Sequence, residues 1–156
     1  MADEADDKPE GDGITDVFAH LDDKDWFLQS LIELADIGIE LGVTLSAQGM
    51  LISGILISGK RYFEQLSEDV KSGTGPNASE KIVSLISRSF KQFVVIYEKP
   101  EDAGDDWKAP KPAYVHLRDA RFFMPGQPPL PNNKGVLWRG KLNRVTGFVL
   151  ANLTAE

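Results

Sequence analysis

The sequence has no cysteine and only two histidines, His20 and His116, in 156 residues. Without thiols, thiolate catalysis, iron–sulfur clusters and cysteine-ligated zinc are excluded, and the composition fits a reducing compartment. Two histidines are also too few for an imidazole-rich metal site. We therefore expect no metal and no cofactor.

Long hydrophobic runs are missing as well. The longest apolar stretch, MLISGILIS at residues 50–58, has nine residues and contains serine and glycine. A membrane-spanning helix needs about 20 apolar residues, and the chain does not open with a basic segment followed by an apolar one. The sequence predicts no membrane span and a cytoplasmic protein.

Basic residues are scarce at the start of the chain, and acidic residues are scarce near its end. The net charge is -7, but residues 1–25 carry ten acids and two lysines, so the acidity belongs to this arm. Residues 107–155 carry a single acid, Asp119, and are therefore basic. Their bases are Lys108, Lys111, Arg118, Arg121, Lys134, Arg139, Lys141 and Arg144.

The acidic start has few apolar residues with which to offset the entropy of ordering. We predict a disordered acidic arm at residues 1–20 and a single α+β domain at residues 21–156. The arm is either a solvated tail or a segment that docks on a basic surface, its own or a partner's.

The first regular elements are a helix and two strands. Apolar residues at helical spacing after Asp25 predict a helix of about 12 residues that Gly38 ends. Its predicted apolar stripe consists of Trp26, Phe27, Leu31, Leu34 and Ala35. Alternation in IELGVTL, residues 39–45, predicts a half-buried strand, and residues 50–58 predict a second one.

The stretch GILISGKR, residues 54–61, fits a phosphate-binding loop except that Arg61 replaces the Ser or Thr that would hold magnesium. Nucleotide hydrolysis at Lys60, with Glu98 near the metal, is one interpretation. The second strand is the other, because LISG repeats at an odd offset of five residues. The two copies then face opposite sides of a strand that bends at Gly54.

Two helices and the closing strands follow. Residues 60–71 predict a short helix, and Asn77 with Glu80 predicts the cap of another that runs to about residue 97, although residues 92–98 also suit a strand. Residues 114–123 predict a strand, and residues 136–153 predict one or two more, interrupted near Gly140 or Asn143. The order predicts an α+β fold with a small, strongly bent antiparallel sheet or partial barrel, an N-terminal helix and a helical insertion after the second strand.

No catalytic set emerges from the sequence. In a regular strand, His116 shares a face with Tyr114, Arg118, Ala120 and Phe122, while Asp119 lies on the other, so they do not form a dyad. Cations interleaved with aromatic residues suit an acidic protein surface or nucleic acid. The predicted partner-binding residues are Arg118, Arg121, Trp138, Arg139, Lys141 and Arg144, although these bases could instead only neutralise the acidic segments.

Three segments, IELGVTLSAQGMLISGILISGKRYFEQL, YVHLRDARFFMPGQ and GVLWRGKLNRVTGF, resemble the gas vesicle accessory protein U family over most of residues 26–150. The resemblance implies a non-enzymatic protein that aids the assembly or clustering of gas vesicles through protein–protein contacts. Gas vesicle shell or other accessory proteins are the implied partners, and self-association is possible. No catalytic residue comes with it.

The element order and the Arg139-Gly140 pair also resemble Sm-like barrels, which implies an oligomeric RNA-binding module as the alternative function. RNA-binding members have Asp and Asn after the bent strand, whereas this chain has GKRYFEQL there. The acidic arm would also repel phosphates. Nucleic acid is therefore the less favoured partner.

Overall fold

The computed structural model describes residues 24–154, so the predicted disordered arm at residues 1–20 lies outside the described residues. The elements, in chain order, are α2 (Trp26–Asp36), β1 (Leu41–Ala47), β2 (Met50–Ile57), α3 (Gly59–Gly73), α4 (Glu80–Lys91), the 3-10 helix η1 (Gln92–Tyr97), β3 (Tyr114–Phe123), β4 (Val136–Lys141), the 3-10 helix η2 (Leu142–Arg144) and β5 (Val145–Val149).

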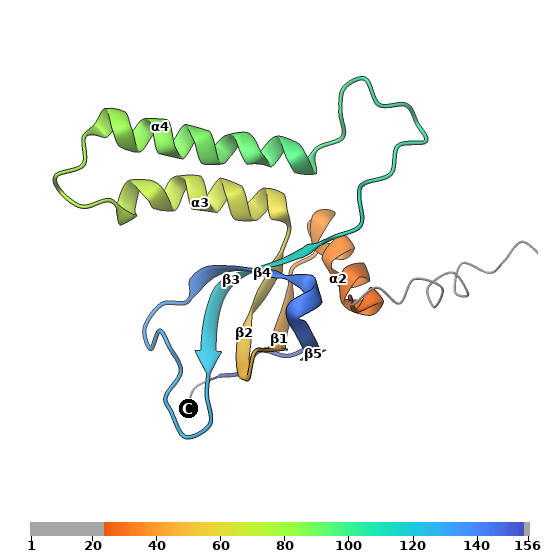
Figure 1. Ribbon diagram of the computed structural model, residues 1–156, viewed down its shortest axis with the longest axis vertical. Coiled ribbons are helices and arrows are strands. Elements are labelled where there is room, and N and C mark those ends of the chain that lie inside the picture. Colours follow the sequence, from red (N-terminus) through yellow and green to blue (C-terminus); the bar gives the residue numbers. More distant parts are fainter. Residues whose placement is uncertain (1–23, 155–156) are drawn as a thin grey trace, which may run out of the picture.

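The strands form one antiparallel sheet in the order β4-β3-β2-β1-β5. The sheet is not closed, because its two edge strands, β4 and β5, are joined in sequence by η2 and not by a ladder among the described residues. Helices α3 and α4 form a hairpin inserted between β2 and β3 (Figure 1). The predicted α+β fold with an N-terminal helix and a helical insertion is confirmed.

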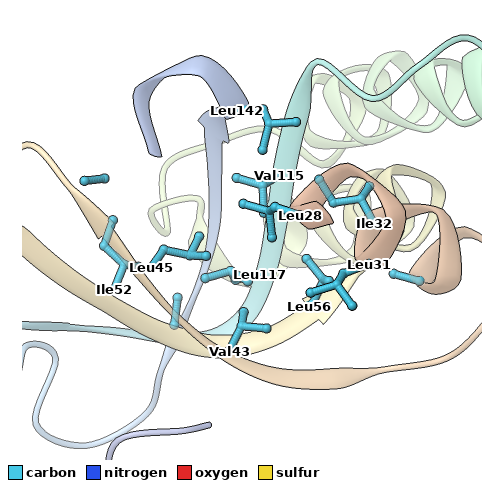
Figure 2. Packing of buried hydrophobic residues seen from close by; sticks show 13 residues of the cluster. Leu28, Leu31, Ile32, Val43, Leu45, Ile52, Leu56, Val115, Leu117 and Leu142 are labelled. Atoms are coloured by element: carbon cyan, nitrogen blue, oxygen red, sulfur yellow. The ribbon is translucent and has the colours of Figure 1, made fainter. Parts of the chain in front are cut away.

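Helix α2 packs against one face of the sheet, and the hydrophobic core lies between them. Asp25 begins it by accepting hydrogen bonds from the backbone N–H groups of Phe27 and Leu28. The buried side chains of α2 are Leu28, Leu31, Ile32 and Ala35, and they meet Val43, Leu45, Ile52, Leu56, Val115, Leu117 and Leu142 in one cluster (Figure 2).

The predicted apolar stripe of α2 is partly wrong. Leu31 and Ala35 are buried, but Trp26, Phe27 and Leu34 are exposed. Apolar residues surround much of this helix, and the buried set has the spacing i, i+3, i+4, i+7 that forms one continuous face. The aliphatic side chains of the buried set pack against the sheet, so Trp26 and Phe27 lie on the exposed side of the helix.

Strand β2 is buried on both faces, as the LISG repeat predicts. Leu56 is buried in the core, whereas Leu51, at the matching position of the first repeat, is exposed. Ile57 and Ser53 are buried on the opposite face, where Ser53 Oγ accepts a hydrogen bond from the backbone N–H of Leu153. The strand interpretation of GILISGKR is therefore confirmed for its first four residues.

A β-bulge in β3 changes which side chains face the core. Ser53 of β2 pairs with Arg121 of β3, and Ile55 pairs with Arg118. One residue separates the pair in β2 and two separate it in β3, so β3 holds one extra residue there. Asp119 at the bulge has a φ of 51°. The prediction that Ala120 and Phe122 share a face with Tyr114 and Arg118 is wrong, because the extra residue turns both toward the core.

The helical insertion matches the prediction except at its second cap. Helix α3 begins after Ser58, whose Oγ accepts a hydrogen bond from the Arg61 N–H. Ser79 and not Asn77 caps α4, because its Oγ accepts a hydrogen bond from the Ile82 N–H. The α-helix ends at Lys91, and the chain continues as η1 to Tyr97, so residues 92–97 are helical and not a strand.

We predict that Gly54→Ala lowers the free energy of unfolding by about 1–3 kcal/mol. A Cβ atom at this position would lie 2.9 Å from the carbonyl oxygen of Arg118 and 3.1 Å from Cα of Ala120, in the backbone of the bulged strand. Gly104→Ala is the matched control, because nothing lies within 4 Å of a Cβ there. Urea unfolding of both variants measures the difference, and equal stability of the two would contradict it.

Candidate partner-binding site

A cleft of about 350 Å³ lies where the sheet fails to close. We call it the seam cleft. Its lining comes from the end of β1, the β1–β2 turn, β2, β3, β4, η2 and the start of β5: Ala47, Gln48, Met50, Ile52, Phe122, Trp138, Arg139, Gly140, Lys141, Arg144 and Val145. It joins apolar side chains to three bases at the open edge of the sheet.

Local structure fixes the aromatic side chain of the cleft. Trp138 pairs with Leu117 across the β3–β4 ladder and packs against the core cluster. Its indole covers Gly140, where any Cβ atom would overlap the ring. The glycine of the Arg139-Gly140 pair therefore gives the tryptophan its place.

The bases beside the indole are positioned by η2. Leu142 is fully buried, and its N–H donates to the carbonyl of Ala113 at 3.0 Å. This anchor holds the 3-10 turn that presents Lys141 and Arg144 on either side, both exposed. None of the ion pairs of residues 24–154 includes these two bases.

Arg139 serves a different contact from its neighbours. Its guanidinium carbon lies 3.5 Å from the centre of the Tyr114 ring, and its Nε donates to Nε2 of His116 at 3.2 Å. Two rings of α3 pack against His116: Tyr62 at a tilt with its ring centre 4.8 Å away, and Phe63 edge-on at 6.3 Å. This cluster of Tyr62, Phe63, Tyr114, His116 and Arg139 joins the helical hairpin to β3 and β4.

The imidazole of His116 is neutral in this environment. It is 2 % exposed, and burial, together with the positive charge of Arg139, lowers its pKa to about 3. The neutral ring can accept the hydrogen bond from Arg139, which the protonated ring could not. His116 is thus a structural acceptor that holds the guanidinium over Tyr114.

Arg118 and Arg121 lie away from the seam cleft. Arg118 is paired with two carboxylates, Glu40 at 2.7 Å and Asp119 at 2.6 Å. Arg121 donates to the backbone carbonyl of Asn133 at 2.7 Å. Of the six predicted partner-binding residues, the structure brings Trp138, Arg139, Lys141 and Arg144 together and places Arg118 and Arg121 elsewhere.

The residues of the nucleotide-loop motif also have other contacts. A Cβ atom at Gly59 would overlap the ring of Tyr97, so this glycine admits the η1 side chain against the start of α3. Lys60 forms an ion pair with Glu98 at 3.0 Å, with both side chains about half exposed. The acidic partner that the sequence suggested for a metal is therefore a partner of the lysine.

Sequence reasoning missed the apolar floor of the seam cleft. Met50, Ile52 and Phe122 come from β2 and β3, and the bulge at Asp119 is what turns Phe122 toward them. A non-glycine residue in the left-handed region has no clear sequence signal beyond the tolerance of Asp for it. Among residues 24–154 no group of three His, Cys, Asp or Glu side chains could hold a metal.

Residues 25–153 match the sequence model of the family described as gas vesicle protein GvpU-like. The match includes every helix and strand described above, so the chain belongs to this family. The predicted family resemblance is confirmed, and the protein is gas vesicle-related. Comparison with curated proteins and with solved structures gives no match. No helix within residues 24–154 is long and apolar enough to cross a membrane.

We predict that acidification destabilises the protein partly through His116. Its folded pKa, about 3, lies below the unfolded value of 6.5, so the unfolded chain binds more protons between these values. The stability contribution is therefore complete above pH 6.5 and is lost as the pH falls toward 3.

In His116→Gln the amide oxygen can still accept from Arg139 but does not titrate. Between pH 6 and pH 4.5 the free energy of unfolding should fall less steeply in this variant, by up to about 1.4 kcal/mol per pH unit. Urea unfolding at several pH values measures both slopes. Identical slopes in the wild type and the variant would show that His116 does not contribute.

Proposed function

We propose that the protein is a non-enzymatic gas vesicle accessory protein of the cytoplasm that aids the assembly or clustering of gas vesicles through protein–protein contacts. Membership of the GvpU-like family supports the link to gas vesicles. The observation that supports a protein contact is the seam cleft. Its Trp138 indole and apolar floor are flanked by Lys141 and Arg144, which belong to none of the ion pairs of the described residues. Its proposed partner is a gas vesicle shell protein or another accessory protein.

The chemistry of the cleft favours an acidic protein segment with an apolar side chain. Tryptophan and arginine are the residue types that most often dominate the energy of a protein interface. An apolar side chain of the partner would contact Trp138 and Met50, and its carboxylates would lie near Lys141 and Arg144. Electrostatic complementarity of this kind increases the association rate and selects the partner.

The contacts of the remaining bases support a protein partner over RNA. Single-stranded nucleic acid needs a continuous basic groove with aromatic platforms. Arg118 is neutralised by Glu40 and Asp119, and the Tyr114 ring that could stack a base already carries the Arg139 guanidinium. Only Lys141 and Arg144 of the predicted surface then remain for phosphates at the seam.

We predict that Lys141→Glu/Arg144→Glu reduces binding to isolated gas vesicles at least tenfold, because both bases would become repulsive to an acidic partner. Gas-filled vesicles float on centrifugation, so the fraction of protein that floats with them measures binding. Lys71→Glu/Lys108→Glu has the same change in charge on α3 and in the loop before β3, and it should bind as the wild type does. Equal flotation of the two variants would exclude the cleft.

Deleting the gene from a vesicle-producing cell should change vesicle yield, shape or clustering, as electron microscopy can show. Unchanged vesicles would contradict the proposed role. The RNA alternative is tested separately with single-stranded RNA at low salt. Binding that is lost on Lys141→Glu/Arg144→Glu and weakens steeply with salt would favour RNA over a protein partner.

A further inference from the structure

Helix α4 presents an apolar face that no other part of residues 24–154 covers. Ile82, Leu85 and Ile86 follow helical spacing and are between 37 and 55 % exposed. We call these three residues the α4 stripe. The helix contacts α3 through another side, where Ser87 Oγ donates to the carbonyl of Ser67 at 2.7 Å. α4 has no buried residue, although its apolar and polar residues are clearly separated.

The charges beside the stripe indicate what can cover it. Lys81 and Arg88 lie four residues before and three after Leu85, so they flank the stripe on one edge. Lys91 adds a third base, and Glu80 is the only acid of the helix. Two α4 helices packed face to face would bring like charges together, so a second α4 stripe is a poor occupant. An acidic segment with apolar anchors is complementary.

The chain contains such a segment before the described residues. Ile14, Val17, Phe18 and Leu21 have the spacing i, i+3, i+4, i+7 with which an amphipathic helix anchors in a groove. Acids are interspersed with these anchors and follow them, and residues 1–25 have ten acids against two lysines. Both the apolar spacing and the sign of charge match the α4 stripe.

The length of the connection decides which copy supplies the segment. Leu21 precedes Trp26, the first residue of α2, by five residues, which span at most about 18 Å. Helix α2 is itself about 16 Å long, and Figure 1 shows that its first turn lies at the end away from α4. Within one chain, the connection would have to run back fully extended along α2 before reaching even the nearer end of the stripe. A neighbouring copy has no such constraint.

We propose that residues 14–21 of one copy dock as an amphipathic helix on the α4 stripe of a second copy, with Asp16, Asp22 and Asp23 near Lys81 and Arg88. The donor and acceptor surfaces differ, so the contact is head-to-tail and extends into chains unless a ring closes. This inference does not depend on the proposed contact with gas vesicles. It adds a self-association surface on α4.

Because the chain has no cysteine, one introduced thiol can be labelled uniquely. The Ala19→Cys variant carries a nitroxide spin label and no isotope, and it is mixed with ¹⁵N-enriched wild-type protein that carries no spin label. NMR line broadening then reports only contacts between copies. Amide signals of residues 82–93 should lose at least half of their intensity relative to the reduced label. Broadening at residues 138–145 and not at α4 would overturn the proposal, because the arm would then occupy the seam cleft.

Charge and apolar variants complete the test. Lys81→Glu/Arg88→Glu in the enriched chain should abolish the broadening, and Lys141→Glu/Arg144→Glu should retain it. Phe18→Ser in the labelled chain should reduce the broadening at least threefold without altering the spectrum of residues 24–154. Broadening that persists in both the α4 variant and Phe18→Ser would contradict docking on the stripe, as would broadening seen only when label and isotope share one chain.

Discussion

The close approach of β2 and β3 at Gly54 is the constraint on which the sheet depends. A glycine in β2 lets the backbone of Arg118 and Ala120 come within contact distance, and Asp119 takes up the extra residue in the left-handed region. The bulge reverses the facing of β3 midway along the strand. Before it, Leu117 faces the core and Arg118 meets Glu40; after it, Phe122 turns inward to the seam cleft.

A second contact, between Arg139 and the aromatic rings around His116, attaches the helical hairpin to this sheet. Burial keeps His116 neutral, so the imidazole accepts a hydrogen bond while α3 packs over it. The first turn of α3 and η1 therefore attach the hairpin to the sheet. Helix α4 contributes no buried residue. The consequence is a helix whose apolar face stays exposed among residues 24–154.

Much of the fold could be predicted from the sequence because its signals are local. Alternation in β1, the odd offset of the LISG repeat and the length of β3 gave the strands, and Gly38 marked the end of α2. The errors arose where tertiary packing chose between two locally acceptable solutions. The sheet selected the Leu28 side of α2 over the Trp26 side, and Ser79 was a better-placed cap than Asn77.

The candidate site was predictable only in part for the same reason. Trp138, Lys141 and Arg144 are close in sequence and line the same cleft. Arg118 and Arg121 instead lie further along β3, where they bind carboxylates and a backbone carbonyl. Residue type did not reveal that Arg139 would stack on Tyr114. Family membership in turn links the chain to gas vesicles without naming the surface that meets them.

The proposed contact between the seam cleft and gas vesicle proteins can be tested by photo-cross-linking. A photoreactive amino acid at position 50, inside the cleft, can be compared with one at position 124 in the β3–β4 loop, since both sites hold methionine. After illumination on isolated vesicles, mass spectrometry identifies the cross-linked peptides. We predict adducts to vesicle proteins from position 50 and few from position 124. Adducts from position 124 with none from position 50 would contradict it.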